Sequence, residues 1–239
     1  MGRVVTFSQL NGRGEGDGVT TAPVTVGDTK EMAVEFVRLE PGKQWTASVP
    51  SGSDCYLFAL KGAASISAGG ESHDFAPQTF ATVEEDVEFT VKNGNAPAEF
   101  VKVLAPPQPN DKLAGFKQKI AVAERGRTPA VDLPEQKKKR IYFAGHQHGA
   151  KTDRGHAMIV VYVKDTFTCL HHHPNAESMF VPLDGALQFT VNGEQVVVAP
   201  GQAAYFPMHD KHGLHVANGH TGASFLEFHI PAAFTTVKE

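Results

Sequence analysis

The sequence has few of the features that mark secreted, membrane or nucleic-acid-binding proteins. Only two of its 239 residues are cysteine, Cys55 and Cys169, so we expect no disulfide framework and a reducing, cytoplasmic location. No segment approaches the roughly 20 apolar residues of a membrane span, and the N-terminus lacks the apolar run of a signal peptide. The formal net charge of −4 gives no reason to expect nucleic acid or an acidic membrane as a partner.

Helical periodicity is also scarce. Short alternating apolar segments, broken by Gly, Pro, Asn and Asp, fill most of the chain and predict a mainly β protein. Hairpin signals interrupt this alternation at Lys61-Gly62, Asp184-Gly185 and Asn192-Gly193. A helix is expected only around residues 111–125, after the Pro-rich segment APPQPN.

The chain repeats itself. LFALKGAASIS aligns with VPLDGALQFTV at an offset of 123, and DFAPQTFATV aligns with VVAPGQAAYF at the same offset. Further on, VKNGNAPAEFVKVLAPP matches VANGHTGASFLEFHIPA at an offset of 125. Three matches in the same order predict two copies of one small β domain, residues 1–110 and 140–239, joined by a short, partly helical connector at 111–139.

Histidine is plentiful, with 12 residues, and most of them follow position 145. In the block TFTCLHHHPNAESMF, His171 and His173 are alternate residues of a predicted strand. Their side chains therefore project from one face, about 6.6–6.8 Å apart along the strand, while His172 faces away. Neutral imidazole is the commonest metal ligand in proteins, so the pair predicts a metal site that a histidine from another strand would complete.

The segments HHHPNAESMFVPLDG and APGQAAYFPMHDKH resemble the two sequence motifs of the cupin family. In these motifs a His-x-His with a downstream Glu and Gly is followed by Pro-Gly, a Pro and a final His. The resemblance implies two jelly-roll barrels. It also implies that His171, His173 and His212 hold one divalent transition metal ion. Imidazole ligands admit Fe, Mn, Ni, Co, Cu or Zn.

The fourth metal ligand of the cupin pattern has two candidates. Glu177 has one of the usual spacings after His173, but counting back from Gly185 leads to Ser178. If a β-bulge turns Glu177 inward, Glu177 is a metal ligand or the proton acceptor in catalysis. Otherwise the site has three histidines, with Ser178 in the place of the carboxylate. We favour Glu177.

The first copy has the framework of the repeat without its histidines. Ser48, Pro50 and Val87 occupy the positions that correspond to His171, His173 and His212. We therefore expect metal binding in the second copy alone.

Several other residues have an ordinary structural interpretation. The basic run at 137–140 is interpreted as a solvated strand edge. His229 and Glu227 lie on the strand face opposite Leu226 and Phe228, and His229 is interpreted as a half-exposed polar residue. Cys169 shares the strand phase of His171, and a buried apolar role is its default interpretation.

The resemblance implies chemistry on a small-molecule substrate. Our first hypothesis is a mononuclear metal-dependent dioxygenase that acts on an enediol, flavonol or diketone-like substrate. The alternatives are a non-oxidative metalloenzyme (an isomerase, decarboxylase, cyclase or lyase) that uses the metal as a Lewis acid, and a metal- or ligand-binding module without catalysis. A homodimer formed through a strand edge or the connector is a further expectation.

Overall fold

The computed structural model describes residues 1–25, 29–109, 111 and 118–239. Within these residues the chain forms β-strands and turns, with two short 3-10 helices, η1 (Phe7–Gln9) and η2 (Pro134–Gln136). The predicted all-β fold is confirmed. No helix in the described part of the chain is long and apolar enough to cross a membrane.

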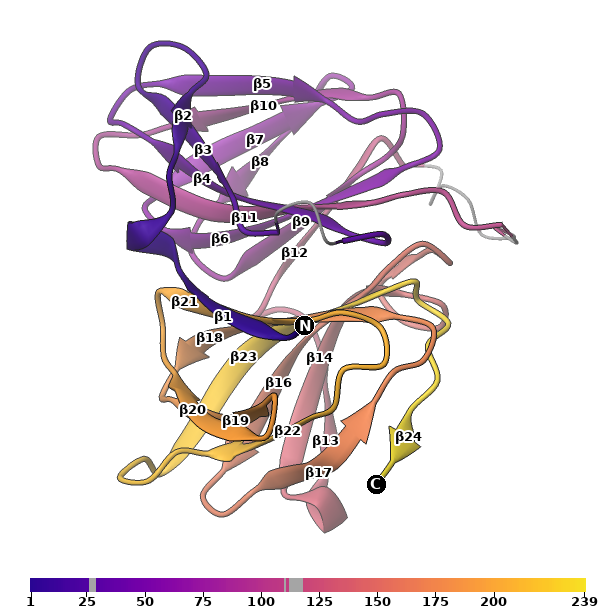
Figure 1. Cartoon of the computed structure of the whole chain (residues 1–239). Coiled ribbons are helices and arrows are strands. Elements are labelled where there is room, and N and C mark those ends of the chain that lie inside the picture. The colour runs from indigo at the N-terminus through magenta and orange to yellow at the C-terminus, as the bar shows by residue number, and fades with distance from the viewer. Residues whose placement is uncertain (26–28, 110, 112–117) are drawn as a thin grey trace.

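Two antiparallel sheets form the first unit, drawn at the top of Figure 1. Its larger sheet has the strand order β12 (Ile120–Glu124), β9 (Thr79–Val83), β6 (Asp54–Lys61), β11 (Ala98–Ala105), β4 (Ala33–Leu39), β3 (Val19–Pro23) and β2 (Arg13–Gly14). Its smaller sheet has the order β5 (Gln44–Ser48), β10 (Glu88–Asn93), β7 (Ala64–Ala68) and β8 (Glu71–Phe75).

The second unit lies below the first and is built in the same way (Figure 1). Its larger sheet has the order β1 (Arg3–Thr6), β21 (Gln202–Phe206), β18 (Glu177–Asp184), β23 (Gly222–Ile230), β16 (His156–Val163), β14 (Lys138–Gly145) and β13 (Ala130–Leu133), with β15 (Ala150–Lys151) parallel to β14. Its smaller sheet has the order β20 (Glu194–Val198), β19 (Leu187–Val191), β22 (His212–Val216), β17 (Phe167–His172) and β24 (Val237–Lys238).

The chain passes between the two units more than once. It begins in the second unit, where β1 pairs with β21, and then builds the first unit. Inside the predicted connector, β12 pairs with β9 of the first unit, and β13 pairs with β14 of the second. The second unit therefore includes β1, which precedes the first unit in the sequence, and each unit takes one edge strand from the predicted connector.

The helix expected around residues 111–125 is wrong for residues 120–124, which form β12. The edge of β9 offers unpaired backbone groups, and pairing with this edge overrides a marginal helical pattern. Residues 112–117 of the expected helix lie outside the described residues.

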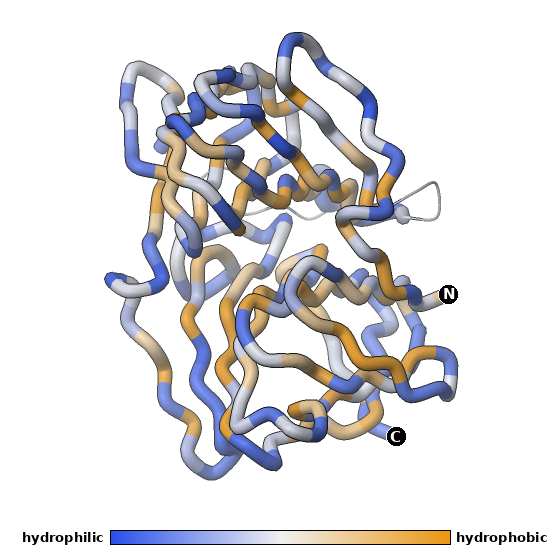
Figure 2. The backbone as a smooth tube through the Cα atoms, turned by 90° about the vertical axis from the view of Figure 1, so that its left-hand side faces the viewer, coloured by the Kyte–Doolittle hydropathy of each residue, from blue (hydrophilic) through white to orange (hydrophobic). Residues whose placement is uncertain are grey.

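The described residues form three apolar cores. One lies inside each barrel, and the third joins the two larger sheets face to face. In the joining core, Phe80 of the first unit stacks on Phe143 of the second, with ring centroids 4.9 Å apart. Figure 2 shows hydrophobic residues along the segments that run through the interior and hydrophilic residues at many of the outer turns. Because the larger sheets are covered on both faces, successive residues of their central strands are buried, as in β6 and β18.

A buried ion network also crosses the junction between the units. Arg154 of the second unit donates to Asp54 of the first at 3.0 Å and to Asp111 at 2.8 Å, and it contacts Glu85 at 3.4 Å. The Arg154 side chain is 4% exposed and that of Asp54 is fully buried. A pair buried this deeply is costly to break, because the remaining carboxylate of Asp54 is left buried without a counter-charge.

Replacing Arg154 is expected to destabilise the protein strongly. We expect Arg154→Met to lower the free energy of unfolding by about 3–5 kcal/mol, measured by urea denaturation. The control is Arg127→Met, because Arg127 is 81% exposed and pairs with the partly exposed Glu124. This control is expected to change stability by less than about 0.5 kcal/mol. Equal effects of the two substitutions would contradict the network's role.

Candidate metal centre

Three histidines meet inside the second barrel. β17 and β22 are neighbouring strands, and their register places His171 directly opposite His212. An irregularity in β17 between Thr168 and His171 adds one residue and sets this register. His173 follows the end of β17 with the same phase as His171. One ligand nitrogen from each of the three imidazoles lies within 4.8 Å of the other two.

Backbone carbonyls orient all three rings. Nδ1 of His171, His173 and His212 lies 2.8, 2.9 and 3.0 Å from a carbonyl oxygen. These carbonyls belong to Cys169, Thr235 and Asp210, respectively. Because a carbonyl only accepts, each Nδ1 carries the hydrogen and each Nε2 keeps a lone pair. The Nε2 atoms of His173 and His212 are buried without a hydrogen-bond partner.

Burial keeps these imidazoles neutral. It lowers the pKa of His171, lowers that of His173 to about 4 and lowers that of His212 well below its ordinary value. The neighbouring imidazoles add to the effect, because a second positive charge nearby disfavours protonation. Neutral imidazoles with unpartnered, converging nitrogens are the form that binds a metal, so this buried triad could bind a metal ion.

The structure does not bring Glu177 to this triad. The Glu177 carboxylate accepts hydrogen bonds from the backbone N–H groups of Lys30, Glu31 and Met32, at 2.7, 3.2 and 3.1 Å. The bulge that would turn it inward is absent here, because β18 pairs regularly with β23 from Glu177 to Pro182. The irregularity lies between Pro182 and Asp184 and accounts for the extra residue before Gly185.

Ser178, the other candidate, lies on the side of the strand that faces the histidines. Its hydroxyl is 2.9 Å from Nδ1 of His229, and Nε2 of His229 is 2.6 Å from the Glu227 carboxylate. The His229 ring also lies 4.8 Å from that of His173. Burial alone would raise the pKa of Glu227, but the hydrogen bond from His229 and the positive charge of Arg140 lower it to about 2.

The interpretation of His229 as a half-exposed residue is therefore wrong, since it is 1% exposed. The alternation of side chains along the strand could have predicted the burial of His229. Leu226 and Phe228 enter the core between the units, which leaves the opposite face, with Glu227 and His229, for the barrel interior.

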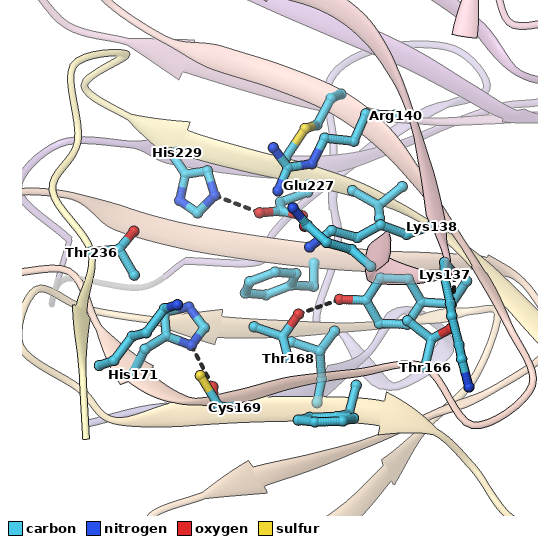
Figure 3. A pocket seen from close by; sticks show the side chains of 18 of the residues that line it. Lys137, Lys138, Arg140, Thr166, Thr168, Cys169, His171, Glu227, His229 and Thr236 are labelled. Carbon is cyan, nitrogen blue, oxygen red and sulfur yellow. Dashed lines mark hydrogen bonds and ion pairs between the residues drawn. The ribbon is translucent and has the colours of Figure 1, made fainter. Parts of the chain in front are cut away.

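A pocket of about 790 Å³ adjoins the triad (Figure 3). Glu227, His229 and His171 line it, together with apolar side chains such as Met158 and Phe180. Cys169 also lines the pocket, but it is exposed and not a buried apolar residue. The second barrel thus combines a metal-binding group of histidines with a cavity large enough for a small molecule.

Comparison with known proteins agrees with this arrangement. Residues 145–229 match the model of the cupin domain family. A comparison with curated protein sequences finds no match. A deletion mutant of Bacillus subtilis oxalate decarboxylase has a similar fold, with a TM-score of 0.72 and 15% identity over 98% of this chain and 78% of the other.

Two further solved structures are similar over the whole chain. The oxalate decarboxylase of Lactobacillus farciminis, in complex with formate, has a TM-score of 0.72 and 16% identity over 98% of this chain and 88% of the other. A putative glyoxylate-induced protein from Pseudomonas aeruginosa has a TM-score of 0.75 and 15% identity over 100% of this chain and 88% of the other. These matches show the fold of two paired barrels.

Removing two histidines of the triad is expected to abolish metal binding. We expect the purified protein to hold about one metal ion per chain, and His171→Ala/His173→Ala to hold almost none, because one imidazole cannot retain the ion. Elemental analysis of protein prepared without a metal-affinity tag measures this. The matched control is His172→Ala, whose ring contacts Glu239 instead. Equal metal content in all three proteins would refute the site.

Metal uptake is expected to withstand mild acid. Because the pKa of His173 is lowered to about 4, its nitrogen stays neutral well below pH 6.5, and protons compete only as the pH approaches 4. In the metal-free protein, the unfolded imidazoles take up protons that the folded ones do not. The free energy of unfolding should therefore fall as the pH falls from about 6.5 toward 4. Zn²⁺ competition titrations and urea denaturation at several pH values measure both effects. A tenfold loss of Zn²⁺ affinity between pH 7.5 and 6.5 would contradict the expected acid tolerance of metal uptake.

Proposed function

With a cupin domain at residues 145–229 as the premise, we propose that this protein is a metal-dependent enzyme for a small, oxygen-chelating substrate. His171, His173 and His212 would hold one divalent transition metal, and the adjoining pocket would hold the substrate. The observation that carries this proposal is the set of three buried imidazoles whose Nδ1 atoms are engaged by carbonyls, so that the Nε2 atoms are left for a ligand.

The reaction we favour is oxygen-dependent cleavage of an enediol, flavonol or diketone-like substrate. A divalent metal, when bound, lowers the pKa of a substrate hydroxyl and holds two reactants in contact. Three neutral ligands leave its full charge available, which favours an anionic chelating substrate, and they leave coordination positions for both substrate oxygens. Met158, Val160 and Phe180 line the pocket and would exclude water from the reacting group.

A specific observation favours a second candidate, a non-oxidative proton transfer. His229 lies between the Ser178 hydroxyl and the Glu227 carboxylate, and both His229 and Glu227 line the pocket. Since Glu227 is ionised above about pH 2, the hydrogen of His229 belongs on Nε2, and Nδ1 accepts from Ser178. Such a pair can hold and move a proton without oxygen, as an isomerase, decarboxylase or lyase requires.

Oxygen dependence separates the two candidates. We expect the protein reconstituted with Fe²⁺, Mn²⁺, Ni²⁺ or Co²⁺ to consume O₂ in proportion to substrate loss, measured with an oxygen electrode and a panel of flavonols, β-diketones and reductones. His171→Ala/His173→Ala should abolish this activity, and His172→Ala should retain it.

Turnover at an undiminished rate under strict anaerobiosis would refute the dioxygenase and support the non-oxidative enzyme. Absence of turnover with every metal, in air and without it, would contradict both candidates. A protein that binds metal under these conditions would then be a binding module.

A further inference from the structure

The basic run at 137–140 does not form a solvated edge throughout. Lys138 and Arg140 are alternate residues of β14 and both line the pocket of the metal centre. Lys139, between them, faces the other way, is exposed and pairs with Asp132 at 3.2 Å. Strand alternation thus separates Lys138 and Arg140, which face the pocket, from Lys139, which faces the surface. Lys137, the exposed residue that ends η2, also borders the pocket.

The charges of Lys138 and Arg140 lack a close counter-ion. In the part of the chain that the structure describes, neither Lys138 nor Arg140 has a carboxylate oxygen within 4.0 Å. Nη1 of Arg140 donates to the Tyr142 hydroxyl at 3.4 Å, and its Nε is buried without a hydrogen-bond partner. The carboxylate of Glu227 is in the same pocket, but it accepts the hydrogen bond of His229.

The environment of Lys138 also indicates an excess of positive charge in this part of the pocket. Burial lowers the pKa of Lys138, and the charge of Arg140 lowers it further, with only partial compensation from Glu227. Two cations held together in a partly desolvated wall repel each other, and an anion placed between them would relieve this repulsion. A guanidinium with a free Nε offers the planar fork that matches a carboxylate.

We infer that Lys138 and Arg140 form a subsite for a second anionic group of the substrate, a carboxylate remote from the chelating oxygens. Figure 3 shows both side chains on the side of the pocket away from His171, with Glu227 between Arg140 and His229. The apolar side chains of Met158 and Val160 line the same cavity, which suits a short hydrocarbon chain between the two polar ends. This inference rests on the proposed function, because it assigns the other end of the substrate to the metal.

Paired ligands that differ only at the remote end test the subsite. 2-Oxoglutarate and 2-oxopentanoate share a chelating 2-oxo acid, and 2-oxoadipate and 2-oxohexanoate form a second pair that is one carbon longer. Calorimetric titration of the Zn²⁺-loaded protein should give at least about tenfold tighter binding of the dicarboxylate in one pair or both. Arg140→Met/Lys138→Met should bring this ratio to about one.

The matched control is Lys139→Met, which removes a charge from the same run but on the exposed side, and should keep the wild-type ratio. Metal content, measured first, distinguishes failure of the proposed function from failure of the subsite alone. A protein that takes up no metal refutes the proposed function and the subsite with it. With one ion bound per chain, a ratio near one for both pairs in the wild type overturns the subsite alone. A preference that persists in Arg140→Met/Lys138→Met overturns it as well.

Discussion

The burial of both faces of the two larger sheets governs the placement of the side chains that the larger sheet of the second unit contributes to the pocket. One face of each sheet packs against the other unit and the opposite face lines its own barrel, so successive residues of a strand enter two different environments. In β23, Phe228 enters the joining core, whereas Glu227 and His229 enter the pocket. In β18, Glu177 contacts residues 30–32 and Ser178 contacts His229. A shift of one residue would exchange these sets.

The metal centre depends on backbone as much as on side chains. The ring of His171 is held by the carbonyl of Cys169 in its own strand, and the ring of His212 by the carbonyl of Asp210, two residues before β22 begins. The ring of His173 is held by Thr235, from the segment before β24, and the neighbouring Phe234 stacks on His229 at 3.9 Å. The last residues of the chain therefore set the hydrogen position of one ligand and cover the acid–base pair beside it.

Much of the fold and the histidine triad could be predicted from local patterns. The internal repeat and the turn signals predicted two small β domains, and strand alternation placed His171 with His173. The resemblance to the cupin motifs implied the barrels and added His212. The sequence favoured Glu177 over Ser178 as the residue facing the metal, but the choice depended on where the strand accommodates the extra residue before Gly185. The structure accommodates it after Pro182, beyond both candidates. The strand at residues 120–124 and the role of Arg140 depended on partners distant in sequence, which local propensity does not report.

The placement of β1 in the second unit has a consequence for synthesis of the chain on the ribosome. β1 pairs with β21, about 200 residues later in the sequence. At a translation rate of about 5–20 residues per second, β21 is synthesised on the order of 10–40 s after β1. During that time the first unit can collapse, but β1 has both of its strand edges unpaired. A nascent chain with such an edge is a natural client for chaperones, and slower translation would lengthen its exposure.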